Sequence, residues 1–348
     1  MISMKSSRSL VADRKVSEAV ARLDIAYSDP AELQSRLATP GVHPMAILSF
    51  GHTFPHTFSC PVIALDLPQI DGPPLVEAWT CDRPIQTQED SGCSIAMNRD
   101  FLVGSISLSE KPGVSLDVTT YAAYREMLSQ LRELGYPYLW RAWNYFPCIN
   151  DDQEGLERYR RFCVGRHHAL TETLSDYPFS LPAGTAVGTR SGPLQVVFLA
   201  GTQPAAHLSN PRQLNAYEYP RNYGPCSPSF ARATVTRSES GCLLFLAGTA
   251  SIVGHMSRHV GLPNEQTRET IQNVRAVLTH AKHVAGIDFT RAQHRAVFKV
   301  YVRDSDSLPE IRRVLKKSPL FGDQILFLQG DLCRKELLVE IEGLIVSE

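Results

Sequence analysis

The sequence predicts an α+β protein built from two similar units in tandem. Two decapeptides, FLVGSISLSE from Phe101 and FLAGTASIVG from Phe245, both read as an apolar strand that ends in small and polar residues. The segments after each decapeptide alternate between helical and strand periodicity in the same order. Because an amphipathic helix buries one stripe against a sheet, each unit is expected to carry its helices on one sheet face.

The first unit continues with four elements after its decapeptide. We expect a helix over residues 118–134, a strand over 138–146, a helix over 155–173 and a closing strand over 194–200.

The second unit repeats this order. Its first helix is expected over residues 266–284, where apolar residues recur at spacings of three and four: Ile271, Val274, Val277, Leu278 and Ala281. The next strand, over residues 294–303, alternates apolar and polar side chains as a half-buried strand requires. A short helix over residues 308–316 and a last strand over residues 337–346 complete the unit.

Turn-forming residues mark the joint between the units. Residues 202–228 are rich in proline, asparagine and aromatic residues, and a loop of this length is more often functional than idle. We therefore expect four segments, which are an N-terminal extension (1–40), a first domain (41–205), a linker and active-site loop (206–230) and a second domain (231–348).

Composition excludes several classes of function. The formal net charge of −1 argues against a general affinity for nucleic acid or anionic membranes, so particular arginines must bind any anionic ligand. No apolar run is long enough to cross a membrane, and the N-terminal residues lack the apolar core of a secretory signal. The 8 cysteines are scattered singly without a CxxC pair, which predicts reduced thiols and a cytoplasmic protein.

No metal or cofactor is expected. His255 and His259 have the spacing of a helical metal pair, but no HExxH context and no nearby third ligand accompany them. No pattern in the sequence indicates a nucleotide or a redox cofactor.

The last strand carries the most informative pair of residues. Glu340 and Glu342 lie at an i, i+2 spacing within LLVEIEGLIV, so both side chains leave the same strand face. Two neighbouring acids in a partly apolar setting resist ionisation, which would leave a proton available for general acid catalysis. The alternative is an exposed polar strand face without chemistry.

Two tyrosine and arginine pairs are candidate ligands for a carboxylate, because a guanidinium donates two parallel hydrogen bonds. Tyr159 and Arg166 are seven residues apart, which places them on one helix face two turns apart. Tyr219 and Arg232 bracket the turn-rich loop. Each arginine could instead be a solvated surface charge or a member of an ion pair.

Cys333 precedes Glu340 by seven residues in a predicted turn. The neighbouring Arg334 could favour a reactive thiolate. The alternative is a small buried apolar residue, which is the commoner role of a lone cysteine.

Several motifs resemble known families. The C-terminal part resembles the imine deaminase (RidA/YjgF) superfamily through GTASIVGH, QTRETIQNVRAVL, KVYVRD and VEIEGLIV. The whole chain resembles the chorismatases, two-domain relatives that cleave chorismate and release pyruvate. The segments that carry this second resemblance are NYFPCIN, GLERYRRFCVGR, YEYPRNYGPCSPSFARA, GTASIVGHMSRH and GDLCRKELLVEIE.

The resemblance implies two tandem RidA/YjgF-like (chorismate-mutase-like) α/β sandwich domains that form a pseudo-oligomeric unit with the pocket between the halves. We therefore expect a monomer, with self-association through a remaining sheet edge as the alternative. It implies that Glu340 is the catalytic acid. Cys333 also gains a catalytic role, because the branch that makes 3-hydroxybenzoate has a cysteine at this position. The residues that the resemblance assigns to binding of the substrate are Tyr159, Arg166, Tyr219 and Arg232.

The expected reaction is cleavage of chorismate to pyruvate and 3-hydroxybenzoate, with or without some 4-hydroxybenzoate, after Glu340 protonates the enolpyruvyl group. One alternative is hydrolysis to pyruvate and a dihydroxycyclohexadiene carboxylate. A second alternative is an imine or enamine deaminase. This activity is disfavoured because Ile325 stands where that superfamily has its substrate-binding arginine. A ligand-binding module without catalysis is a third.

Overall fold

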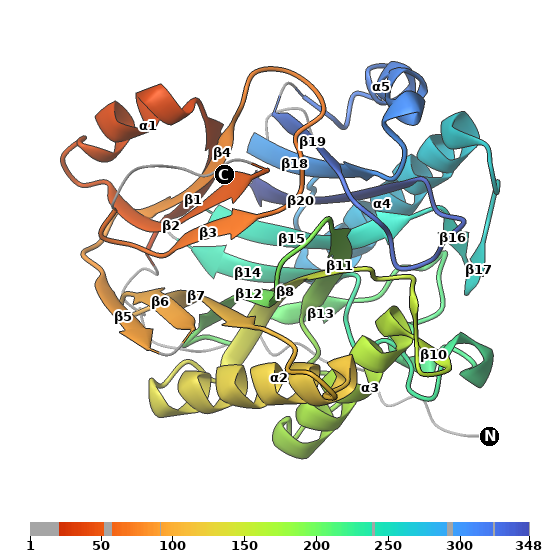
Figure 1. Ribbon diagram of the computed structural model, residues 1–348. Helices are drawn as coiled ribbons and strands as arrows, with labels where there is room; N and C mark the ends of the chain where they lie inside the picture. The colour runs from red at the N-terminus through yellow and green to blue at the C-terminus, as the bar shows by residue number, and fades with distance from the viewer. Residues whose placement is uncertain are drawn as a thin grey trace, which may run out of the picture.

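The computed structural model describes residues 21–51, 58–90, 92–238, 241–290, 295–322 and 324–347. Three larger sheets lie in the centre of this part of the protein, and the helices lie on the outside (Figure 1). No helix in the described ranges is long and apolar enough to cross a bilayer.

The middle of the chain forms a six-stranded sheet covered by two helices, α2 (Leu116–Glu133) and α3 (Arg158–Thr173). Its strands, in their order across the sheet, are β11 (Ala183–Thr189), β8 (Tyr138–Pro147), β12 (Leu194–Gly201), β7 (Phe101–Leu108), β6 (Cys93–Met97) and β5 (Gln86–Asp90).

The C-terminal part forms a second six-stranded sheet, with helices α4 (Pro263–Ala285) and α5 (Leu308–Leu315). Its strands, listed from the edge that corresponds to β11 in the first sheet, are β19 (Ile325–Gln329), β18 (Arg295–Val302), β20 (Val339–Ser347), β15 (Gly241–Ala250), β14 (Ala233–Ser238) and β13 (Ala206–Leu208).

The two six-stranded sheets have the same topology, which confirms the predicted tandem fold. In each sheet the first two strands, β11 and β8 or β19 and β18, pair in parallel, and the third strand pairs antiparallel with the second. The predicted helices match α2, α3, α4 and α5 to within three residues at each end. The strands β11 and β19 were not predicted, because AGTAVGT lacks the bulky side chains typical of strands and β19 is only five residues long.

Helix α3 begins later than expected. A short hairpin of β9 (Asp152–Gln153) and β10 (Leu156–Glu157) occupies the first residues of the predicted helix. Gly155 has a φ of 80° at the hairpin turn, a conformation that interrupts a helix and that glycine adopts without strain.

The N-terminal part adds a third, shorter copy that the sequence did not predict. Its helix α1 (Pro30–Leu37) lies between β1 and β2 in the chain, as α2 lies between β7 and β8 and as α4 lies between β15 and β18. Its strands, listed from the matching edge, are β3 (Val62–Leu65), β2 (His43–Phe50), β4 (Val76–Cys81) and β1 (Leu23–Ser28). The β2 and β3 pair is parallel, and the β2 and β4 pair is antiparallel, as in the other two sheets.

The domain boundaries stay a prediction. The proposed N-terminal extension contains β1 and α1, while residues 1–20 lie outside the described part of the chain. The four-stranded sheet is hydrogen-bonded separately from the six-stranded sheet that follows it, although both lie within the predicted first domain.

One apolar core joins the three sheets. It combines Trp79 from β4, Trp143 from β8 and Phe245 from β15, all of which are at most 5% exposed. The two indole rings meet edge to face, with their centroids 5.1 Å apart. Separate apolar clusters lie between the six-stranded sheets and their own helices. The inner faces of the sheets are thereby buried against one another.

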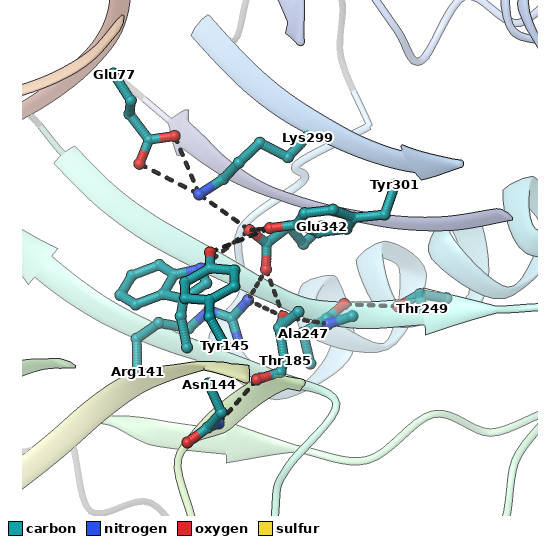
Figure 2. A network of polar contacts seen from close by, with 12 residues as sticks. Glu77, Arg141, Asn144, Tyr145, Thr185, Ala247, Thr249, Lys299, Tyr301 and Glu342 are labelled. Atoms are coloured by element: carbon teal, nitrogen blue, oxygen red, sulfur yellow. Dashed lines mark hydrogen bonds and ion pairs between the residues drawn. The ribbon is translucent and has the colours of Figure 1, made fainter. Parts of the chain in front are cut away.

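A buried group of charges lies within this central core (Figure 2). Lys299 Nζ of β18 lies 3.1 Å from Glu77 Oε2 of β4 and 3.1 Å from Glu342 Oε1 of β20. Arg141 Nη2 of β8 lies 2.5 Å from Glu342 Oε2. These four side chains come from all three sheets and are at most 5% exposed. Two cations and two carboxylates therefore balance one another away from water.

Replacing Lys299 with methionine should strongly destabilise the fold. The change leaves Glu77 and Glu342 buried without their shared cation, and breaking a buried ion pair costs about 3–5 kcal/mol. Urea unfolding followed by tryptophan fluorescence measures this loss. The control is Lys282→Met, because the ion pair of Lys282 with Asp288 is at the surface and should contribute less than about 1 kcal/mol. Equal losses in the two variants would contradict the prediction.

Candidate active site

A cavity of about 600 Å³, its open mouth included, lies between the two larger units. One wall comes from α3 of the middle unit, and the others come from β15, from β20 and from the loops that precede β14 and β20 in the C-terminal unit. A smaller compartment opens beside it, and both compartments are lined by Tyr159, Phe230, Gly248, Cys333 and Glu340.

The carboxyl of Glu340 lines both compartments. It lies on β20 between Ala250 of β15 and Tyr301 of β18, and it is 4% exposed. Burial, together with the nearby charge of Glu342, raises the pKa of Glu340 to about 8. The carboxyl is therefore mostly protonated at pH 7, and the alternative of an exposed polar strand face is wrong.

Glu342 differs from Glu340 in its protonation. Although burial acts to raise its pKa, Lys299 and Arg141 together lower the pKa of Glu342 below its ordinary value. Its carboxylate also accepts hydrogen bonds from Thr185 Oγ1 and from Tyr301 Oη, the latter at 2.8 Å (Figure 2). The two glutamates at an i, i+2 spacing thus have opposite protonation states: Glu340 is neutral and Glu342 is charged.

The first predicted ligand pair, Tyr159 and Arg166, lies on α3 beside Glu340. The Arg166 side chain is buried, with its guanidinium 4.7 Å from the Phe162 ring centroid. Its Nε and Nη2 atoms have no hydrogen-bond partner among the residues that the structure describes. Because an unpaired buried donor is costly, these two atoms are suited to receive hydrogen-bond acceptors from a ligand.

The second predicted pair, Tyr219 and Arg232, lines the larger compartment. Arg232 Nη2 donates to Tyr219 Oη at 2.9 Å and to the Leu214 carbonyl at 3.0 Å. Its Nε is buried and has no partner within the described ranges. Phe230 lies under both guanidinium groups, with its ring centroid 5.0 Å from Arg232 Cζ and 5.9 Å from Arg166 Cζ.

Cys333 completes the predicted set, so the structure places all six predicted side chains around one site. Burial, and secondarily the nearby Glu340, raise the pKa of the Cys333 thiol to about 12, although Arg334 acts in the opposite direction. The thiol is therefore neutral, and the idea that Arg334 makes it a thiolate is wrong. A neutral thiol fills space and donates a weak hydrogen bond.

Comparisons with known proteins place this chain in a family. The family described as "Chorismatase FkbO/Hyg5-like, N-terminal" matches residues 77–200. A 3-hydroxybenzoate synthase of Streptomyces hygroscopicus is 35% identical over 286 residues, and the match covers 78% of this chain and 82% of the relative. A chorismatase of the same organism is 36% identical over 280 residues, and the match covers 79% of this chain and 80% of the relative. The chain belongs to the chorismatase family.

The chorismatase fold extends over nearly the whole chain. A crystal structure of a chorismatase matches with a TM-score of 0.82 and 31% identity, covering 95% of this chain and 100% of that one. The resemblance inferred from the sequence motifs is confirmed.

Two further residues line this cavity: Arg334, which the sequence singled out only as a neighbour of Cys333, and Gly248, which the sequence did not single out. The Arg334 guanidinium lies 4.2 Å from the Tyr223 ring centroid, and its Nη1 donates to the His255 carbonyl at 2.9 Å. Gly248 packs so closely on Glu340 that a Cβ would clash with Oε1. Arg334 and Gly248 lie within motifs that carry the family resemblance, but only the folded chain shows that they line the cavity.

His255 lies beside Tyr223, which lines the larger compartment. Its Nδ1 lies 3.1 Å from Tyr223 Oη, and Nε2 of His259 lies 3.2 Å from Glu269 Oε2. Within the described ranges, no three side chains of the metal-binding types form a cluster.

Replacing Glu342 with glutamine should lower the pKa of Glu340. The change removes a negative charge that raises this pKa, and it leaves the opposing Arg141 without its partner, so both effects favour the Glu340 carboxylate. An infrared titration of the carboxyl band measures the shift, with the Glu340→Gln/Glu342→Gln double variant as the blank. A pKa at or above the wild-type value would contradict this interpretation.

Proposed function

We propose that this chain is an enzyme that cleaves chorismate to pyruvate and 3-hydroxybenzoate. The observation that carries the proposal is the protonated Glu340 carboxyl between two compartments, each of which holds a buried guanidinium with unpartnered donors. The names of two relatives, a 3-hydroxybenzoate synthase and a chorismatase, support the same reaction.

The proposed substrate suits the charges of the site. Chorismate is a dianion with one carboxylate on its ring and one on its enolpyruvyl ether. Arg166 lines the smaller compartment, and Arg232 lines the larger one together with Arg160 and Arg334. The donors of both arginines that lack partners would each gain a carboxylate oxygen. A neutral Glu340 does not repel the dianion, which an ionised carboxylate at this point would do.

In the proposed reaction, Glu340 gives its proton to the enolpyruvyl methylene carbon. A C–H bond forms there, and the ether carbon becomes an oxocarbenium ion that the new Glu340 carboxylate stabilises. If water attacks this ion, the hemiketal collapses to pyruvate and a dihydroxycyclohexadiene carboxylate. If water is kept out, pyruvate leaves as the ring rearranges and becomes aromatic.

The atoms of the aromatic route balance without a further reactant. Pyruvate and 3-hydroxybenzoate together contain the atoms of chorismate, so the route needs no oxidant, reductant or cofactor. The neutral thiol of Cys333 lines both compartments together with Glu340, where it can exclude water, and the Glu340 carboxylate formed in the first step can accept the ring proton. Because one chain supplies both sides of the pocket, we also propose that the protein acts as a monomer.

The test of the proposed function is incubation of the purified protein with chorismate, with the products identified by chromatography and mass spectrometry. We expect pyruvate and 3-hydroxybenzoate. Glu340→Gln keeps the shape of the side chain but removes its proton, so pyruvate release should fall by roughly 10²–10⁴-fold. The matched control is Glu265→Gln at the exposed start of α4, which should keep wild-type activity. Diene diol as the main product would indicate the hydrolase, and no pyruvate would reject the proposal.

Replacing Cys333 with alanine should move product from 3-hydroxybenzoate towards the diene diol. Loss of the sulfur atom leaves a larger, wetter pocket that favours attack by water, and roughly 1.4 kcal/mol in one of two competing barriers changes the product ratio about tenfold. The ratio is measured by chromatography at equal substrate conversion. Cys60→Ala, in a separate apolar cluster, is the control and should leave the ratio unchanged. An unchanged ratio in the Cys333 variant would reject its part in the partition.

A further inference from the structure

The segment that carries Cys333 has little regular structure of its own. Residues 330–338 connect β19 to β20, and they place the side chains of two consecutive residues, Cys333 and Arg334, in the pocket. The start of the segment is fixed by the backbone, since Asp331 exchanges two hydrogen bonds with Gly188 of β11, at 2.7 and 3.1 Å. Beyond Asp331, side chains from elsewhere hold the segment.

Arg303 makes three of the hydrogen bonds from these side chains to the backbone of the segment, and Gln266 makes two. Arg303 follows directly after β18, and its side chain is 15% exposed. Its Nη2 donates to the carbonyls of Leu332 at 3.2 Å and Arg334 at 2.9 Å, which are the residues on either side of Cys333. Its Nε donates to the Leu337 carbonyl at 2.8 Å. One guanidinium thus holds three carbonyl groups of the segment.

Two further contacts fix the guanidinium of Arg303 itself. Nη1 lies 2.5 Å from Asp331 Oδ1, and Nη2 lies 3.1 Å from Asn150 Oδ1. Asn150 comes from the middle unit, and its Nδ2 donates to the same Leu332 carbonyl at 3.0 Å. Residues of both units therefore set the position of Cys333. Arg303 does so from outside the pocket, because its side chain does not line either compartment.

We propose that Arg303 is a positioning residue that fixes Cys333 in the pocket and thereby sets the partition between the aromatic product and the diene diol. The second half of this inference rests on the proposed function. Lysine cannot replace Arg303, because a single ammonium group lacks the planar fork that reaches carbonyls on two sides. The charge is the same, so Arg303→Lys separates the geometry of the contacts from their electrostatics.

Arg303→Lys should shift the product ratio in the same direction as Cys333→Ala, but by a smaller amount. Because charge-assisted hydrogen bonds to two flanking carbonyls are lost, we expect the ratio of diene diol to 3-hydroxybenzoate to rise by up to about tenfold. Total pyruvate release should fall less than the ratio changes, because Glu340 is untouched. A general loss of stability would slow both products together and leave the ratio unchanged. The control is Arg312→Lys, whose partner Asp71 lies outside the pocket.

A second readout does not depend on chorismate. The rate at which N-ethylmaleimide labels Cys333, followed by peptide mass spectrometry, should rise in Arg303→Lys but not in Arg312→Lys, because a loosened segment exposes the thiol. Labelling of Cys148, which is exposed already, provides the internal reference. An unchanged labelling rate together with an unchanged product ratio would overturn the inference. If the wild-type protein releases no pyruvate, the proposed function fails, and labelling alone then decides whether Arg303 positions Cys333.

If Arg303→Lys does not fold, Asn150→Ala gives the same test. This change removes one hydrogen bond to the Leu332 carbonyl and one contact of the Arg303 guanidinium. We expect a shift of product ratio and labelling rate in the same direction and of smaller size. No shift in either quantity would overturn the inference.

Discussion

The structure depends on one buried arrangement of charge, the ionised Glu342 held between Arg141 and Lys299. Three sheets must close around these groups, since Glu77, the second partner of Lys299, comes from the N-terminal sheet. A charge taken out of water is tolerated only with partners, so the fold and the ionisation of Glu342 depend on each other. The neighbouring Glu340 makes no ion pair with any residue that the structure describes, and burial keeps its carboxyl protonated although Arg141 and Arg232 act in the opposite direction.

The site thereby combines neutral acids with permanent cations. Glu340 and Cys333 both hold their protons, while Arg166 and Arg232 keep their charges and some donors without partners. A pocket of this kind attracts a dianion and still contains a proton donor. An ionised carboxylate at the position of Glu340 would repel the dianion and would have no proton to give. Phe230, packed against both guanidinium groups, keeps the two cationic positions apart and their surroundings apolar.

Sequence reasoning predicted the features that have a local signal. Periodicity located α2 and α4, the repeated decapeptides revealed the two larger units, and motif resemblance collected Glu340, Cys333 and the tyrosine and arginine pairs. The third copy was missed because β3 has four residues and the copy lacks a second described helix. The support of the Cys333 segment by Arg303 was also invisible, since the contacts join residues about 30 positions apart and involve carbonyls rather than side chains.

One chain contains three copies of the same topology, and the copies differ in sequence. Such a chain is free of a constraint on its charges that acts on rings of identical subunits. In such a ring every side chain near the centre occurs once per subunit, so each charge must be repeated around the symmetry axis. Here Glu77, Arg141, Lys299 and Glu342 occupy the shared core as two carboxylates and two cations drawn from three unlike sheets. Each junction between copies can change alone, so one junction can carry an acid and a thiol while another carries the ion pair of Glu77 and Lys299.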